Sequence, residues 1–258
     1  VVASAEAVLT ANGYDLVVSV VGASSPRRIV VMNSLMKRVD GVIVVNVDLT
    51  DAEAAMLREW SGVTVNVGME FDSFSSLVVD DVAVAHAATS HLLALGHTDV
   101  AALTGAGHDP LHFSVPERRR KGYRLALGDV GVRRRPELEV EGSFTIRGGY
   151  DAMVSLLALD RPPTAVFAMS DEMAFGALRA VRDRGMDVPG DLSLVGVDDH
   201  PFAWVVDLTT VNQQVTEHGA LAANHLIARL DPASEADVAR MEVAPELVMR
   251  GSTAPRDP

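Results

Sequence analysis

Short apolar runs alternate with amphipathic stretches along the whole chain. The apolar runs predict buried strands at residues 16–21, 42–47, 63–67, 100–103, 137–140, 165–169 and 192–197. Apolar residues at helical spacing predict helices at residues 3–11, 29–36, 52–59, 82–95, 117–127, 149–157, 172–184 and 217–230. Repeated alternation of strand and helix predicts an α/β fold with parallel, doubly wound sheets.

Residues 161–201 show this alternation most clearly. The first predicted strand in this stretch is followed by Ser170-Asp171, a pair typical of a helix N-terminus. The second strand ends at Asp198-Asp199. Two neighbouring parallel strands therefore carry carboxylates at their carboxyl ends, which is the edge where open α/β sheets bind ligands. Aspartates at that edge favour a ligand rich in hydroxyl donors, such as a sugar.

Length and composition indicate a globular chain. The chain has 258 residues and is 48% hydrophobic, which is enough to fill the cores of two lobes. It contains no cysteine, and this excludes disulfides, thiolate metal sites and cysteine nucleophiles. No apolar run reaches membrane-spanning length, so we expect no membrane partner. Residues 1–16 have neither a starting Met nor a charged leader region, which indicates a cut end and not a signal peptide.

The charge balance argues against a DNA-binding surface in this chain. The net charge is −13, whereas a surface that binds duplex DNA needs clustered Lys and Arg to displace counterions. The dense basic runs are confined to residues 118–121 and 133–135. Each is short, so we interpret them as solvated faces or ligand contacts. We therefore expect that this chain does not bind DNA by itself.

Six segments, in the same order along the chain, resemble the lac-repressor-type (LacI/GalR) family of transcription regulators. They are HLLALGHTDVAALTG, from His91 to Gly105, and then ERRRKGYRLAL, GGYDAMVSLLALDRPPTAVFAMSDEMAFGAL, VPGDLSLVGVDD, LTTVNQ and PELVMRGST. Each segment alone is a weak signal. The ordered set is a strong one, because it extends over nearly the whole chain.

The resemblance implies two doubly wound parallel-sheet lobes of the periplasmic-binding-protein-like type I, joined by a multi-strand hinge. The N-terminal lobe is expected at residues 1–80 and 213–240, and the C-terminal lobe at residues 81–212 and 241–258. We expect this chain to lack the family's helix-turn-helix and hinge helix, and also the first strand of the N-terminal lobe. Loss of that central strand would leave backbone groups unpaired.

The same resemblance implies the effector-sensing, dimerising core of a cytoplasmic transcription regulator. A small effector would bind between the lobes and change the affinity for operator DNA, which the missing N-terminal domain would contact. A sugar or related polyol is the effector class that we expect first, and a nucleobase is the second. The resemblance implies a homodimer and no cofactor.

Arg119 and Asp198 match charged cleft residues of the family. By resemblance, Arg119 in ERRRKG reaches into the cleft, where its guanidinium can donate to vicinal hydroxyls or a carboxylate. The alternative is a surface salt bridge with Glu117 or a neighbouring helix. Asp198 would accept two ligand hydroxyls. Its alternative is to cap the following turn, a role that we expect of Asp199.

Five further residues complete the expected ligand site. Phe144 falls where the family often places an aromatic ring against the ligand, although an ordinary core phenylalanine fits equally well; Trp204 is a weaker candidate of the same kind. Ser170 stands where the family prefers asparagine, so it offers one hydroxyl in place of an amide. Asp171 has the alternative role of a helix N-terminal anion. Gln213 in LTTVNQ has the alternative of a hinge hydrogen bond.

The N-terminal lobe departs from the family at one position. Gly68 occupies a place where relatives often carry aspartate. Either a ligand contact is lost there, or Glu70 replaces it. The effector therefore cannot be copied from any one sugar-binding relative.

Other function classes lack support in the sequence. The loop at residues 104–107 lacks the third glycine of a dinucleotide-binding loop, and no nucleophile elbow or P-loop is present. His86, His91 and His97 are not at metal-ligand spacing. Asp198 and His200 have no nucleophile or metal cluster nearby in the sequence, so we predict no enzyme. A periplasmic sugar-binding protein of a transporter shares the fold and remains open, although LTTVNQ and PELVMRGST favour the regulator.

Overall fold

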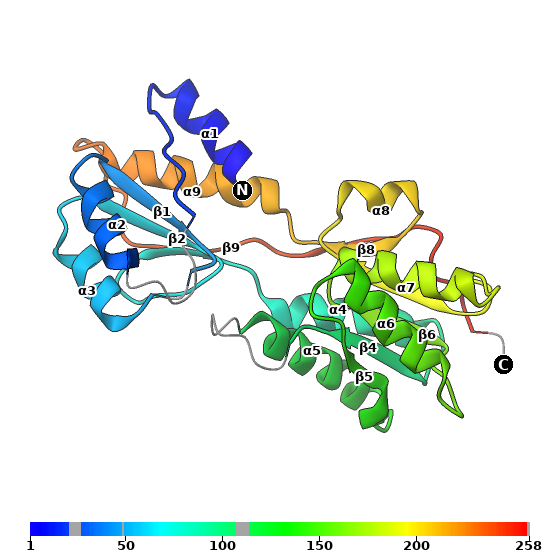
Figure 1. Cartoon of the computed structure of the whole chain (residues 1–258). Helices are drawn as coiled ribbons and strands as arrows, with labels where there is room; N and C mark the ends of the chain where they lie inside the picture. The colour runs from blue at the N-terminus through cyan, green and yellow to red at the C-terminus, as the bar shows by residue number, and fades with distance from the viewer. Residues whose placement is uncertain (21–26, 48, 107–113, 257–258) are drawn as a thin grey trace. The chain divides into compact units, whose positions relative to one another are not determined.

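The computed structural model describes residues 1–20, 27–47, 49–106 and 114–256, which form two compact units (Figure 1). Unit 1 is built from Val1–Val79 and Gln214–Val243. Unit 2 is built from residues 80–106, Ser114–Gln213 and residues 244–256. Each unit is therefore assembled from segments that are far apart in the sequence.

Unit 1 contains a four-stranded sheet in which all neighbouring strands are parallel. The strand order is β1-β2-β3-β9, and the strands are β1 Gly41–Val45, β2 Val63–Val67, β3 Ser75–Val78 and β9 Arg240–Glu242. The helices are α1 Val2–Ala11, α2 Arg27–Met36, α3 Asp51–Glu59 and α9 Val215–Leu230. The alternation of strand and helix thus forms the parallel α/β sheet that the sequence predicts.

The core of unit 1 lies between the sheet and α9. Val65 and Leu77 of the central strands are fully buried against Ala222 and Leu226 of this helix. α1 packs along α9, as Figure 1 shows. Burial of these apolar side chains is the main term that holds the layers together.

The strand predicted at residues 16–21 is wrong for residues 16–20, which form no strand; residue 21 lies outside the described residues. In the described sheet, β1 is an edge strand that pairs with β2 alone. Residues 16–20 therefore have no ladder partner, and Val20 is 95% exposed. β-branched residues favour a strand only when a hydrogen-bonded neighbour is present.

Unit 2 contains a six-stranded sheet of order β10-β8-β7-β6-β4-β5, in which β10 is antiparallel to β8 and all other pairs are parallel. Its strands are β4 Val100–Thr104, β5 Glu139–Glu141, β6 Ala165–Ala168, β7 Ser193–Val197, β8 Thr209–Asn212 and β10 Glu246–Val248. Its α-helices are α4 Asp81–Ala94, α5 Val115–Asp129, α6 Ile146–Leu157, α7 Asp171–Asp183 and α8 Pro201–Val205. The strand predicted at 137–140 begins later, because Pro136–Leu138 forms a 3-10 turn.

Two glycines allow α6 and α7 to pack backbone to backbone. A Cβ atom at Gly149 would lie 2.2 Å from the carbonyl oxygen of Met173, and one at Gly176 would lie 1.9 Å from that of Ile146. Neither position has room for a larger residue. This close packing fixes the N-terminus of α7, and therefore Ser170 and Asp171, relative to the sheet.

Two histidines form hydrogen bonds with Thr253 and Ala254, in the C-terminal tail of unit 2. His97 Nε2 lies 3.1 Å from both Ser193 Oγ and the Ala254 carbonyl oxygen. His91 Nε2 lies 3.0 Å from Thr253 Oγ1. Burial lowers the pKa of both imidazoles, which favours the neutral rings in these contacts. His97 is therefore a structural hydrogen-bonding residue.

Candidate functional site

Unit 2 concentrates unusual backbone geometry just beyond the carboxyl ends of two strands. Ser143 and Phe144, which follow β5, have φ angles of 51° and 53°. Asp198 and Asp199, which follow β7, have φ angles of 118° and 51°. Residues with side chains adopt positive φ rarely, and such strain persists where the surrounding fold holds it, often at ligand sites.

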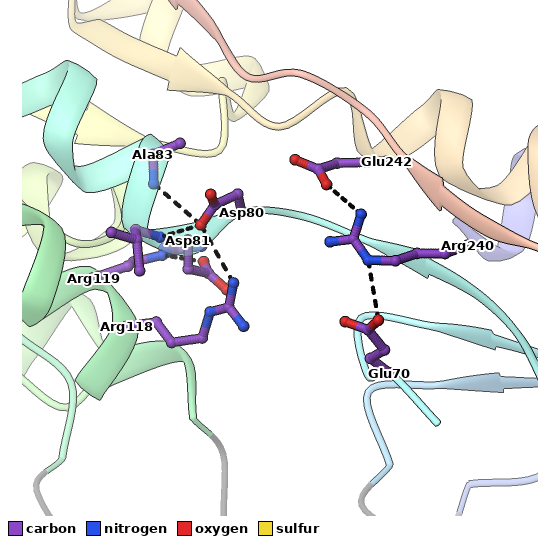
Figure 2. Close-up of polar contacts among 9 residues, drawn as sticks. Glu70, Asp80, Asp81, Ala83, Arg118, Arg119, Arg240 and Glu242 are labelled. Atoms are coloured by element: carbon purple, nitrogen blue, oxygen red, sulfur yellow. Dashed lines mark hydrogen bonds and ion pairs between the residues drawn. The ribbon is translucent and has the colours of Figure 1, made fainter. Parts of the chain in front are cut away.

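Arg119 is held inside unit 2 by three acceptors. Its Nε donates to Asp81 Oδ1 over 2.8 Å, and Nη2 donates to Gln213 Oε1 over 2.9 Å. Nη1 donates to the Met169 carbonyl oxygen. The side chain is only 6% exposed. Of the two alternative salt bridges, the one with Glu117 is wrong, and the one with a neighbouring helix is present, because Asp81 belongs to α4, although the pair is buried and not on the surface. Figure 2 shows Arg119 of α5 beside Asp81, the first residue of α4.

Asp80 fixes the helix that carries Asp81. Its Oδ1 accepts the backbone N–H groups of Val82 and Ala83 over 3.0 and 3.3 Å and so caps α4 (Figure 2). The same oxygen lies 3.3 Å from Arg118 Nη2. Asp80 therefore caps the N-terminus of α4, and Asp81 pairs with the buried guanidinium of Arg119.

Gln213 connects Arg119 to Asp198. Its amide oxygen accepts from Arg119, and its amide nitrogen donates to Asp198 Oδ1. Burial raises the pKa of Asp198, with contributions in the same direction from Asp81 and Glu172. The Arg119 guanidinium and the Gln213 bond lower that pKa. The structure thus brings together three of the residues predicted from the sequence, in the order Arg119, Gln213, Asp198.

Asp199 differs from Asp198 in its partners. Its Oδ1 accepts from Arg250 Nη2 over 2.6 Å, and its Oδ2 accepts from Asn212 Nδ2 over 3.2 Å. The cap of α8 is His200, whose Nδ1 accepts the Phe202 N–H over 3.1 Å. Capping by Asp199 was therefore a wrong prediction, and this carboxylate fastens the turn to the segment after β10.

Asp171 lies inside the unit, with 0% exposure. Its Oδ1 accepts the Thr210 hydroxyl over 2.7 Å, and its Oδ2 accepts the His200 N–H over 2.8 Å. Burial raises the pKa of its carboxyl to about 7. The two bonds lower the pKa, while the Asp198 and Asp199 carboxylates raise it. This carboxyl group therefore joins three elements of the fold.

Ser170, Phe144 and Trp204 occupy different surroundings. The Ser170 hydroxyl accepts the Met173 N–H over 3.3 Å and caps α7. The Phe144 ring lies against Gly105, where a Cβ atom would be 2.2 Å from the ring. Trp204, on α8, is 76% exposed and takes no part in the group formed by Arg119, Gln213 and Asp198.

The corresponding edge of unit 1 explains why position 68 is glycine. Gly68 has φ +91°, and a Cβ atom there would lie 1.8 Å from Asn46 Oδ1. An aspartate does not fit unless Asn46 moves. Glu70 pairs with Arg240 over 3.1 Å, and Arg240 also pairs with Glu242 over 2.6 Å (Figure 2). The carboxylate considered as a replacement is thus already paired.

Sequence reasoning missed two partners of the site. Asp81 was noticed only as part of a lobe boundary, although paired aspartates at a predicted helix start can both cap and bind. Thr210 lies in the segment LTTVNQ, but a threonine by itself gives no signal of a buried carboxylate partner. Both roles depend on contacts between segments far apart in the chain, about 40 residues in each case.

Metal sites and membrane-spanning helices are two further classes of feature to consider in the described ranges. There, no group of three or more His, Asp or Glu side chains is arranged to hold a metal ion. Across those same ranges, no helix combines the length and apolar character that crossing a membrane requires. The site residues offer hydrogen-bond donors and acceptors, which suits a polar organic ligand.

The chain resembles known proteins over most of its length. Residues 89–253 match the periplasmic binding protein-like domain family. The ribose operon repressor of Escherichia coli (strain K12) is 33% identical over 93% of this chain and 73% of its own length. The HTH-type transcriptional repressor PurR of Pasteurella multocida (strain Pm70) is 32% identical over 86% of this chain, which spans 66% of that repressor.

Solved structures agree with these sequence matches. A LacI family transcriptional regulator from Enterococcus faecium, crystallised with bound ribose, superposes with a TM-score of 0.84 and 25% identity, over 98% of this chain and 93% of that one. The α/β fold with parallel-sheet lobes that the sequence predicts is thereby confirmed. The chain belongs to the LacI family of transcriptional regulators and has their periplasmic binding protein-like domain.

Proposed function

We propose that this chain is the effector-binding and dimerising core of a LacI-type regulator, and that a sugar or related polyol binds at the carboxyl edge of the unit 2 sheet. The observation that carries the proposal is the connected group Arg119, Gln213 and Asp198. A guanidinium and a carboxylate, both fixed in place, can donate to and accept from vicinal hydroxyls.

The relatives favour a pentose as the first ligand to test. One relative is named for the ribose operon, and the Enterococcus faecium regulator was crystallised with ribose. A nucleobase is the second class, because the Phe144 ring suits a flat partner. Since Gly68 differs from the family pattern, the ligand of a relative cannot be assigned to this chain without a test.

Control of operator DNA is also part of the proposal. Ligand binding would favour one arrangement of the two lobes by hinge closure, and differential affinity for the arrangements would change DNA binding. A cytoplasmic location and the absence of enzymatic turnover follow from the same proposal. The relatives are repressors, so the alternative of a transporter's sugar-binding protein is not favoured.

A homodimer is proposed on the basis of exposed apolar side chains in unit 2. Phe202, Trp204 and Val205 of α8 are more than 60% exposed, and so is Met249 after β10. Arg250 Nη1 donates to the Leu208 carbonyl oxygen over 2.8 Å, which ties the segment after β10 to the end of the α8 segment. An exposed apolar patch of this kind favours a second copy of the same surface.

A thermal-shift panel of D-ribose, other pentoses, hexoses, polyols, nucleosides and nucleobases tests the ligand class. A ligand at 100 times its dissociation constant adds about 2.7 kcal/mol, which raises the melting temperature by roughly 5–11 °C. Asp198→Asn should weaken binding by roughly 10- to 100-fold, because a charge-assisted bond is lost.

The matched control is Asp183→Asn, at the exposed C-terminal end of α7. It should bind as the wild type does. The site assignment is wrong if Asp198→Asn keeps the full thermal shift, and the ligand class is wrong if only nucleosides or nucleobases produce one.

A further inference from the structure

Asp171 joins three elements that meet at the carboxyl edge of unit 2. It is the first residue of α7, it accepts the His200 N–H in the turn after β7, and it accepts the Thr210 hydroxyl on β8. Its carboxylate lies against β7 at Gly196, where a Cβ atom would be 2.0 Å from Asp171 Oδ1. The glycine therefore makes room for this one side chain.

The turn that Asp171 holds is the one that presents Asp198. Asp198 and Asp199 have φ angles of 118° and 51°, and the next N–H group, that of His200, donates to Asp171. A backbone in these regions needs outside contacts to stay there. On its other side, Asp199 is held by Arg250. Asp171 is therefore one of several residues that hold the strained turn, and its own side chain is fully buried.

We propose that Asp171 is a positioning residue of the ligand site: its ionised carboxylate holds the Asp198 turn in the ligand-binding geometry, and its protonation loosens that turn. The inference rests on the proposed function for its effect on affinity, but not for its effect on the turn. It gives Asp171 a role different from the direct ligand contact expected from the sequence.

Hydrogen-bond chemistry determines which protonation state of Asp171 supports the turn. Both partners of Asp171 are donors, and an ionised carboxylate accepts from both. A protonated carboxyl group carries a donor of its own, which would face the His200 N–H or the Thr210 hydroxyl. One of the two bonds is then weakened, and the turn loses part of its support.

The surroundings place this proton exchange near neutral pH. Burial raises the pKa of Asp171 to about 7, and the carboxylates of Asp198 and Asp199 add to the increase. The charged and titratable groups around this cluster are Glu172 on α7, Arg119 and Asp81 facing Asp198, Arg250 paired with Asp199, and the His200 imidazole. The cluster therefore changes charge near neutral pH, and this change comes from a carboxyl group and not from a histidine.

Tryptophan fluorescence tests the effect on the turn directly. The chain has two tryptophans, so a Trp60→Phe background leaves Trp204, on the helix that follows the turn, as the sole reporter. We expect its emission to change between pH 6 and 8 with a midpoint near 7. Asp171→Asn should abolish the transition. Thr210→Val removes one donor to the ionised form and should move the midpoint to higher pH.

Two controls keep this test specific. His200→Gln removes the nearby imidazole and should keep the transition, and Asp183→Asn should leave it unchanged. The inference is overturned if Trp204 shows no transition in the Trp60→Phe background, or if the transition persists in Asp171→Asn. Circular dichroism checks that each variant is folded.

Titration with D-ribose tests the effect on affinity. If only the ionised form binds, the affinity should be about tenfold weaker at pH 6 than at pH 8, since a midpoint near 7 protonates about nine-tenths of the molecules at pH 6. Asp171→Asn should bind weakly at both pH values. Ribose binding that does not vary with pH overturns the inference and leaves the proposed function standing. If no sugar binds but the Asp171-dependent transition is present, the proposed function fails and the positioning role stands.

Discussion

The carboxyl edges of the two sheets carry two ion pairs that differ in burial: Arg119 with Asp81 in unit 2, and Arg240 with Glu70 in unit 1. In unit 2, charged groups are buried and share partners: the side chains of Arg119 and Asp81 are 6% and 10% exposed. In unit 1, the ion pair between Arg240 and Glu70, which follows β2, is solvated: the two side chains are 50% and 54% exposed. Only the buried arrangement fixes its groups in advance of a ligand, because solvated ion pairs contribute little and rearrange freely.

If the proposed ligand site is correct, this difference between the two ion pairs favours different roles for the two edges. Desolvated charges strengthen every hydrogen bond they make, so unit 2 can define which hydroxyl positions a ligand must present. At the unit 1 edge, Gly68 and Asn46 fit each other, and the Cβ position of residue 68 is filled by an amide oxygen. We therefore expect ligand specificity to reside mainly in unit 2.

The largest expected effect is the difference in lost stability between breaking the buried ion pair and breaking the exposed one. Arg119→Met leaves Asp81 and Gln213 without their partner, and removing one member of a buried pair costs about 3–5 kcal/mol. Arg240→Met, the matched change in unit 1, should cost less than about 1 kcal/mol. Urea unfolding followed by circular dichroism measures both. Equal losses would show that the two edges are not built differently.

The second effect concerns the exposed apolar residues of unit 2. If α8 forms the interface between two copies, Trp204→Asp should weaken the dimer by at least about 2 kcal/mol, as large aromatic anchors do. Light scattering at micromolar concentration should then show a monomer. The control is Val17→Asp in unit 1, which changes an exposed valine outside the proposed surface and should leave the dimer intact. A wild-type monomer contradicts the proposal outright.

Regular elements with strong apolar patterns were predictable from the sequence. The fully buried strands β6 and β7 and the amphipathic helix α7 stand out by composition and spacing, and the structure confirms them. β8 was missed because its sequence, Thr209–Asn212, is mostly polar, even though its threonines are completely buried. Their hydroxyls are satisfied by Asp171 and by the tail, and such long-range partners leave no local pattern.

The candidate site also divides into features that local sequence predicts and features that depend on long-range contacts. Ser170 could be predicted as a helix cap, because capping is a local interaction. The connection from Arg119 through Gln213 to Asp198 joins α5 to the ends of β8 and β7. Family resemblance named these three residues as candidates, but it could not show that they hold one another. The segment at residues 16–20 failed for the opposite reason, since an apolar sequence was present without a strand to pair with.

The third effect tests why unit 1 lacks a carboxylate at position 68. Gly68→Ala places a Cβ atom against Asn46 in a backbone with φ +91°, and it should cost about 1–3 kcal/mol. Asn46→Gly removes the obstructing amide, so the double variant should recover the steric part of the loss and keep the cost of the positive φ. A double-mutant cycle by urea unfolding measures the coupling. If the two losses simply add, Asn46 is not the reason for the glycine.

The smallest expected effect is a change in how stability depends on pH. Burial lowers the pKa of His91 and His97 in the folded chain, whereas an unfolded histidine titrates near 6.5. Below about pH 6.5 the unfolded chain therefore binds more protons than the folded one, so the free energy of unfolding falls as the pH drops. His97→Gln should flatten this decrease, measured by urea unfolding at pH 7, 6 and 5. An unchanged slope in His97→Gln would mean that the imidazole bound to Ser193 and Ala254 is not what couples the tail of unit 2 to pH.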